Sequence, residues 1–123
     1  MNSHSLAERI NSDVNASVTY KTDLEQYDTP DYWVEATALG DCEDYALLKR
    51  QRLLEAGFAR KDLHLACCWV ETEAYHCVLL CNTSKGWFVL DNRYNWPMTP
   101  KSLPYRWDKA LDEVDGKWYE LSF

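Results

Sequence analysis

Runs of apolar residues separated by polar turns predict four strands in the second half of the chain. Residues 63–70 and 75–81 are rich in Leu, Val, Cys and aromatic residues, and residues 86–90 form a third apolar run. Residues 117–121 have the same character and follow Asp-Gly, a common turn pair. The polar segment 82–85 predicts a four-residue hairpin loop between the second and third strands.

Helical spacing dominates the first half of the chain. Apolar residues three to four positions apart predict a helix over residues 5–16, and a longer helix over residues 41–56. Asp41 is a candidate N-cap of the longer helix, and Gly57 a candidate residue for its end. Its expected buried stripe consists of Ala46, the aliphatic stem of Lys49, Leu53 and Ala56.

The predicted hairpin places a histidine opposite a carboxylate. If Cys81 pairs with Gly86 across the four-residue loop, the numbers of paired residues sum to 167, and His76 lies opposite Asp91. Directly paired side chains have Cβ atoms about 5 Å apart. The prediction depends on register, because a shift of one residue moves the two side chains to opposite faces of the sheet.

Cys42 is the candidate nucleophile. In the first turn of the predicted helix it would meet unpaired backbone N–H groups, which favour a thiolate and are suited to stabilising an oxyanion. His76 is the preferred base, and Asp91 would orient its ring. His4 near the terminus and His64 at a strand start have no acid partner that the sequence places.

Three acids flank this cysteine and allow two interpretations. Asp41, Glu43 and Asp44 place negative charge beside a thiolate, which a bound cation would offset, and Ca²⁺ with its six to eight oxygen ligands suits such a set. Alternatively, the acids cap the helix and complement its dipole. Trp33 precedes this segment and is either a core residue or one wall of a substrate cleft.

Composition narrows the class of protein. A chain of 123 residues with 46% hydrophobic residues suits a single globular domain over residues 1–123. The net charge of −7 argues against binding to nucleic acid or to an anionic membrane. We find no signal peptide pattern, which predicts a cytoplasmic protein as encoded. Five cysteines, an odd number, favour a reducing compartment and free thiols over disulfides or zinc ligation.

Together these segments carry a family resemblance. Gly-Asp-Cys-Glu-Asp-Tyr-Ala at residues 40–46, the histidine at 76 and Val-Leu-Asp-Asn at residues 89–92 resemble the bacterial transglutaminase-like cysteine proteinases, a branch of the papain-like cysteine hydrolases. The resemblance implies that Cys42, His76 and Asp91 form a catalytic triad, and that the three acids at 41, 43 and 44 bind calcium. The family's best-known members are periplasmic, calcium-dependent proteases that release adhesins. This short chain is closer in size to the compact members encoded by phages or prophages, and association with a virion is an alternative to the cytoplasm.

The sequence therefore predicts an α+β, papain-like domain with a central helix bearing Cys42, packed on an antiparallel sheet bearing His76 and Asp91. The expected activity is peptide-bond hydrolysis through a thioester acyl-enzyme, with a protein or peptide as substrate. Transglutaminase or deamidase action on Gln, cleavage of peptidoglycan peptides, and a non-enzymatic phage structural or binding role remain alternatives. The oligomeric state is left open.

Overall fold

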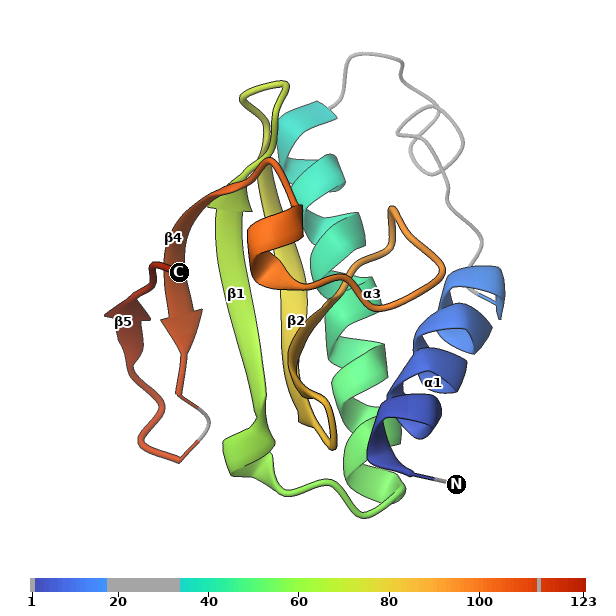
Figure 1. Ribbon diagram of the computed structural model, residues 1–123. Helices are drawn as coiled ribbons and strands as arrows, with labels where there is room; N and C mark the ends of the chain where they lie inside the picture. Colours follow the sequence, from blue (N-terminus) through green and yellow to red (C-terminus); the bar gives the residue numbers. More distant parts are fainter. Residues whose placement is uncertain (1, 18–33, 113) are drawn as a thin grey trace.

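The computed structural model describes residues 2–17, 34–112 and 114–123, with side chains from residue 42 onward in the helix that begins at residue 34. This part of the chain forms two α-helices and a five-stranded antiparallel sheet with strand order β3-β2-β1-β4-β5 (Figure 1). The predicted α+β class is confirmed. The elements are α1 (Ser3–Ser17), α3 (Val34–Glu55), η1 (Arg60–Asp62), β1 (Leu63–Trp69), β2 (Tyr75–Thr83), β3 (Gly86–Leu90), η2 (Pro100–Ser102), β4 (Arg106–Leu111) and β5 (Trp118–Glu120).

The end of α3 follows the prediction, and its start does not. Gly57 has a φ of 105°, its N–H donates to the carbonyl of Leu54, and the N–H of Phe58 donates to the carbonyl of Leu53. These two bonds form a Schellman motif, which glycine permits because it lacks a Cβ. The helix begins at Val34 rather than at Asp41, so the prediction that Asp41 is the N-cap is wrong.

The hairpin between β2 and β3 differs from the predicted one by two residues. Thr83 pairs with Gly86, and Leu80 pairs with Val89, so the numbers of paired residues sum to 169 rather than 167. Only residues 84 and 85 form the loop, and Gly86 has a φ of 108°. A shift of two residues preserves the face on which each side chain lies, because side chains alternate with a period of two.

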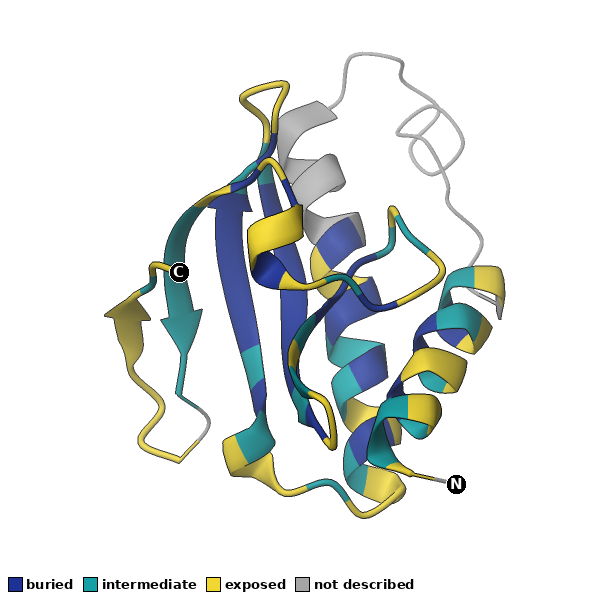
Figure 2. Cartoon of the chain, viewed as in Figure 1, coloured by how far each residue is buried: buried dark blue, intermediate teal, exposed yellow. Residues whose placement is uncertain are grey.

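The two faces of the sheet carry separate apolar clusters. α3 packs mainly against β2 and covers one face, with α1 beside it (Figure 1). That face contains Cys67 and Cys77, whereas the other contains Cys68 and Val78 under the segment of residues 94–105, which includes η2. β1 and β2 are buried along most of their length (Figure 2). All five cysteines are free and buried; burial was predicted for Cys67, Cys68, Cys77 and Cys81, but not for Cys42.

Strand β4 was not predicted. Its sequence, Arg-Trp-Asp-Lys-Ala-Leu, mixes charged and apolar residues, and five of its six residues are only partly buried. It pairs with β1 across a register irregularity between Cys67 and Cys68. Within the described ranges, no helix combines the length and apolar character that a membrane span requires.

Candidate active site

His76 and Asp91 meet across the end of the β2–β3 hairpin. β3 ends at Leu90, which pairs with Leu79, so Asp91 lies just beyond the paired part of the strand. His76 Nε2 lies 2.8 Å from Asp91 Oδ1, and both side chains are buried. Because an ionised carboxylate only accepts hydrogen bonds, Nε2 carries the proton of this bond. The imidazole therefore turns its other nitrogen, Nδ1, away from the carboxylate.

Two further contacts hold the Asp91 carboxylate. The Arg93 N–H donates to Oδ1 at 3.0 Å, and the Tyr105 hydroxyl donates to Oδ2. Burial alone would raise the pKa of Asp91, but the hydrogen bond and charge of His76, together with these donors, hold it below its ordinary value. The carboxylate is therefore ionised and fixed in orientation at neutral pH.

Cys42 reaches this pair along the uncovered edge of β2. β3 pairs with β2 only from Leu79 onward, so the edge of β2 at Cys77 has no β3 partner. The Cys77 N–H donates to Cys42 Sγ at 3.2 Å instead, and the side chains of Cys42 and His76 are hydrogen-bonded. The structure thus places thiol, imidazole and carboxylate in one continuous chain of hydrogen bonds.

The charge balance around His76 favours a protonated ring. Burial lowers the pKa of His76, but the hydrogen bonds to Asp91 and Cys42, with the charges behind them, outweigh it and raise this pKa to about 9. The imidazolium is therefore the dominant form at neutral pH. It is a counter-ion for a thiolate and an acid for a leaving amine.

Cys42 was predicted in the first turn of its helix, but the structure places it further inside α3. It follows the first residue of α3 by about two helical turns, so the unpaired N–H groups of the helix start are remote from its sulfur. The prediction that the first turn of the helix stabilises the Cys42 thiolate is therefore wrong. The Cys77 N–H from β2 provides a hydrogen bond to the sulfur in its place.

The predicted metal and substrate residues are only partly described. Glu43 and Asp44 are exposed on α3, while Trp33 and the side chain of Asp41 lie outside the described residues. Among the described side chains, no group of three or more His, Cys, Asp or Glu is placed to hold a metal ion. The two described carboxylates have the donor type that Ca²⁺ prefers, but supply too few ligands alone.

A family model of the bacterial transglutaminase-like cysteine proteinases, BTLCP, matches residues 2–122. The chain belongs to this family. The match confirms the resemblance seen in the motif around Cys42, and it supports a cysteine hydrolase of the peptidase type. A search of the curated proteins finds no match.

Solved structures similar to this family member include LapG from Legionella pneumophila. The calcium-bound form superposes with a TM-score of 0.68 at 21% identity, covering 93% of this chain and 66% of LapG. A second LapG structure gives a TM-score of 0.65 at 25% identity, covering 87% and 64% of the two chains. An EGTA-treated form gives 0.65 at 22% identity, covering 93% and 69%. The chain thus has the LapG fold and spans about two thirds of the length of LapG.

Tyr105 and Arg93 also contact the candidate active site, and the sequence did not point to either residue. The Arg93 guanidinium donates to the Tyr105 hydroxyl at 3.1 Å and is paired with Glu71. Burial and the bond to Asp91 raise the pKa of Tyr105, so its hydroxyl stays protonated and donates. Tyr105 lies between Pro104 and the start of β4, and nothing in the local sequence indicates that it contacts Asp91.

The other two histidines have structural partners. His64 Nδ1 donates to the carbonyl of Leu111 at 3.0 Å, and its ring stacks on Trp87. His4 Nδ1 lies 3.3 Å from the Thr83 hydroxyl. Neither histidine contacts a cysteine in the described contacts, which agrees with the preference for His76.

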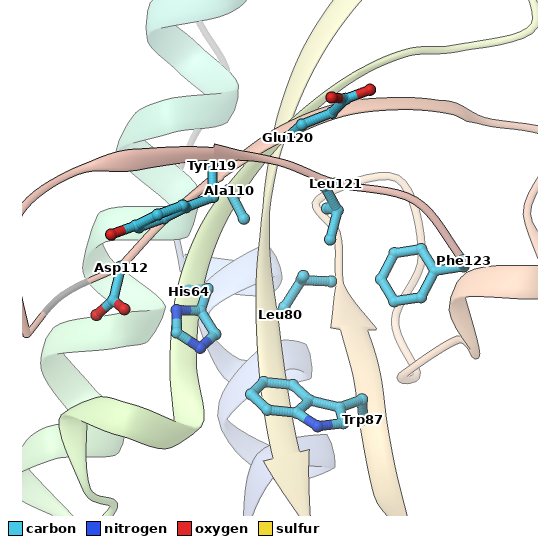
Figure 3. Close-up of a pocket in the computed structure, with 9 residues that line it drawn as sticks. All are labelled: His64, Leu80, Trp87, Ala110, Asp112, Tyr119, Glu120, Leu121 and Phe123. Carbon is cyan, nitrogen blue, oxygen red and sulfur yellow. The ribbon is translucent and has the colours of Figure 1, made fainter.

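An apolar hollow of about 250 Å³ lies on the sheet face away from α3 (Figure 3). Leu80 on β2 and Ala110 on β4 face it from either side of β1, and side chains from β3 and the C-terminal segment complete its lining. The residues that line it are His64, Leu80, Trp87, Ala110, Asp112, Tyr119, Glu120, Leu121 and Phe123. It contains none of the three residues of the hydrogen-bonded chain, so it is distinct from the candidate active site.

Proposed function

We propose that the protein is a cysteine peptidase in which Cys42 is the nucleophile, His76 the general acid and base, and Asp91 the orienting carboxylate. The observation that carries this proposal is the continuous hydrogen-bonded chain from the Cys42 side chain through His76 to Asp91. Membership of a cysteine proteinase family supports the same reaction, and it implies a protein or peptide as substrate.

The mechanism follows from the chemistry of these three groups. The Cys42 thiolate attacks the carbonyl carbon of the scissile amide, and His76 gives its proton to the nitrogen as the C–N bond breaks. This step leaves a thioester on Cys42 and a neutral imidazole. His76 then takes a proton from water, whose hydroxyl attacks the thioester and releases the acid. The imidazolium and thiolate are regenerated, and Asp91 stays ionised throughout.

The thioester also permits transfer to an amine, so the experiment must separate hydrolysis from transglutamination and deamidation. We would incubate the full chain with a peptide library, with and without a primary amine, and identify products by mass spectrometry. Cleaved backbones that do not depend on the amine support a peptidase. A mass gain on Gln that requires the amine, or a conversion of Gln to Glu without cleavage, would overturn the peptidase assignment in favour of acyl transfer or deamidation.

Calcium binding by Asp41, Glu43 and Asp44 is the second part of the proposal. Support comes from their carboxylate chemistry, from the exposure of Glu43 and Asp44, and from the likeness to LapG in a calcium-bound form. When bound, the ion would offset negative charge beside Cys42. The remaining oxygen ligands would come from backbone, water or other side chains.

We expect 1 mM CaCl₂ to raise the melting temperature by about 5 °C, and EGTA to reverse the rise, because a ligand that binds only the folded state stabilises it. Glu43→Gln with Asp44→Asn should remove most of the rise. Glu55→Gln, at an exposed acid near the other end of α3, is the matched control and should leave the rise intact. Equal responses in the double variant and the control would contradict this site.

A further inference from the structure

Cys67 and Cys77 are two cysteines whose thiols the proposed mechanism does not use. They lie directly opposite each other on β1 and β2, whereas Cys68 and Cys81 on the same strands lie opposite residues of other types. The side chains of Cys67 and Cys77 are hydrogen-bonded to each other, and both belong to the apolar cluster that contains Cys42. The structure therefore holds a pair of neighbouring thiols beside the candidate nucleophile.

The hydrogen-bonding pattern between β1 and β2 brings this pair close together. Along an antiparallel ladder, hydrogen-bonded and non-hydrogen-bonded pairs alternate. The Val70 N–H donates to the Ala74 carbonyl at 2.9 Å, and three positions further along the ladder Cys67 and Cys77 form a non-hydrogen-bonded pair. The Cys77 N–H agrees with this assignment, because it points away from β1 and donates to Cys42 Sγ at 3.2 Å.

A non-hydrogen-bonded pair has nearly the spacing that a disulfide requires. Its Cα atoms are about 4.5 Å apart, within the range of about 4.4 to 6.8 Å found in disulfides. Its Cβ atoms are about 4.5 Å apart, and those of a disulfide are about 3.8 Å apart. A small approach of the two strands would therefore allow the sulfur atoms of Cys67 and Cys77 to bond, with both side chains on the same face of the sheet.

Exposure and acidity distinguish this pair from the other two cysteines of the strands. Cys67 and Cys77 are 7% and 4% exposed, whereas Cys68 and Cys81 are 0% exposed. Burial raises the pKa of Cys68 and that of Cys81 to about 12, while the hydrogen bond from Cys77 lowers the pKa of Cys67 below that of an ordinary thiol. Since oxidants react with accessible thiolates, Cys67 is the sulfur expected to react first.

We propose that Cys67 and Cys77 are a modification site, at which a hydroperoxide closes a reversible disulfide and thereby weakens the hydrogen bond from Cys77 to Cys42. The Cys67 thiolate attacks one peroxide oxygen and breaks the O–O bond, which leaves a sulfenic acid and an alkoxide that takes up the thiol proton. The Cys77 sulfur then bonds to the Cys67 sulfur and displaces hydroxide, which leaves as water with the Cys77 proton. The two thiols lose two electrons, and the peroxide gains them.

Closure of the disulfide acts on Cys42 through the backbone of Cys77. This residue contributes its thiol on the side of β1 and its N–H on the uncovered edge of β2, where the N–H meets Cys42 Sγ. Movement of Cys77 towards β1 lengthens the distance from its N–H to that sulfur, so the thiolate loses stabilisation. The expected effect on cleavage rests on the proposed role of Cys42, whereas formation of the disulfide does not.

The first experiment detects the bond without peptidase activity. Folded Cys42→Ala is treated with hydrogen peroxide, the remaining thiols are blocked, and the digested protein is analysed by mass spectrometry. We expect a link between Cys67 and Cys77 that dithiothreitol reverses. If this variant does not fold, wild type with Cys42 blocked by iodoacetamide takes its place. A link through Cys68 or Cys81 in place of this one, or no link, would overturn the proposal.

The second experiment measures the effect on cleavage. Diamide is the oxidant, because it joins pairs of thiols and does not convert a lone thiol such as Cys42 to a sulfenic acid. Oxidised wild type should lose about tenfold in kcat/KM, the effect of weakening a hydrogen bond to a charged group, and dithiothreitol should restore it. Cys67→Ala, or Cys67→Ser if alanine prevents folding, should keep its activity in diamide. Cys81→Ala, a matched control from the same face of β2, should lose activity as wild type does.

Two results would overturn the effect on the site. They are an equal loss of activity in wild type and the Cys67 variant, and full activity in wild type that carries the link. If reduced wild type cleaves no peptide, the proposed function fails, and the rate at which iodoacetamide labels Cys42 replaces kcat/KM. The disulfide should lower this rate severalfold, and an unchanged rate in the linked protein would overturn the proposal.

Discussion

Cys42→Ala is expected to lower kcat/KM for peptide cleavage by about 10⁵-fold, because removal of a nucleophile leaves only binding and electrostatic effects to accelerate the reaction. The thiol accepts a hydrogen bond from the Cys77 N–H and is hydrogen-bonded to the His76 side chain. Alanine provides no group that could replace the thiol in the attack. Hydrolysis of a fluorogenic peptide, identified from the library products, measures the loss. Iodoacetamide should also modify wild type at Cys42 and inactivate it.

The matched control is Cys81→Ala. Cys81 is buried in the same apolar cluster as Cys42, and burial raises its pKa to about 12, so it is an unreactive thiol. The substitution makes the same cavity-forming change in the core without touching His76. Activity within about twofold of wild type is expected once protein concentrations are corrected for folding. Substantial cleavage by Cys42→Ala, or an equal loss in Cys81→Ala, would refute the assignment of the nucleophile.

The pairing of His76 with Asp91 shows why part of the site could be predicted from sequence. The hairpin was predicted two residues out of register, yet the same two side chains meet at 2.8 Å. A shift of two residues keeps both side chains on one face, and an imidazole is long enough to reach a diagonal neighbour. The two-residue period of side chains along β2 and β3 therefore preserved the shared face, while the loop length that sets register was harder to infer.

The start of α3 could not be predicted because its signals conflict. Asp41 with acids close behind is a typical helix start, and Gly40 before it favours a break. Ala36, Ala38 and Leu39 are strong helix formers, and the helix continues through the glycine to Val34. The backbone around Cys42 therefore differs from the expected one, although the thiol still meets His76.

Tyr105 could not be predicted because its role depends on the tertiary fold. It contacts Asp91 from the segment that crosses the face of the sheet opposite α3, 14 residues further along the chain. No periodicity or spacing links a tyrosine in an irregular segment to a carboxylate at a strand end. Lys49 is intermediate, since the helical stripe predicted the burial of its aliphatic stem but not that the whole residue would be buried.

Asp91→Asn is expected to lower kcat/KM by about 10³- to 10⁴-fold, mainly through kcat. The carboxylate accepts from His76, Tyr105 and the Arg93 N–H, and an amide replaces one of these acceptor oxygens with a donor. One hydrogen bond must then become a clash between donors. The imidazolium also loses the negative charge that stabilises it, so the ring is no longer held in the orientation and protonation state that the reaction needs.

The same substitution should change the pH dependence of stability in a defined direction. The pKa of His76 is raised from 6.5 to about 9, so its interaction with Asp91 stabilises the folded protein fully below pH 6.5 and is lost as the pH rises through about 9. The difference in melting temperature between wild type and Asp91→Asn should therefore shrink from pH 6 to pH 10. The NMR midpoint of His76 should fall in the variant.

Asp108→Asn is the matched control for this prediction. Asp108 is a partly buried carboxylate that also accepts a hydrogen bond from a tyrosine, the hydroxyl of Tyr75, but it has no contact with His76 in the described contacts. The control should keep the His76 midpoint of wild type and most of its activity. If both variants lose activity equally, or if Asp91→Asn retains an unshifted His76 midpoint, the carboxylate at 91 does not stabilise the imidazolium. The raised pKa of His76 would then have to come from Cys42 alone.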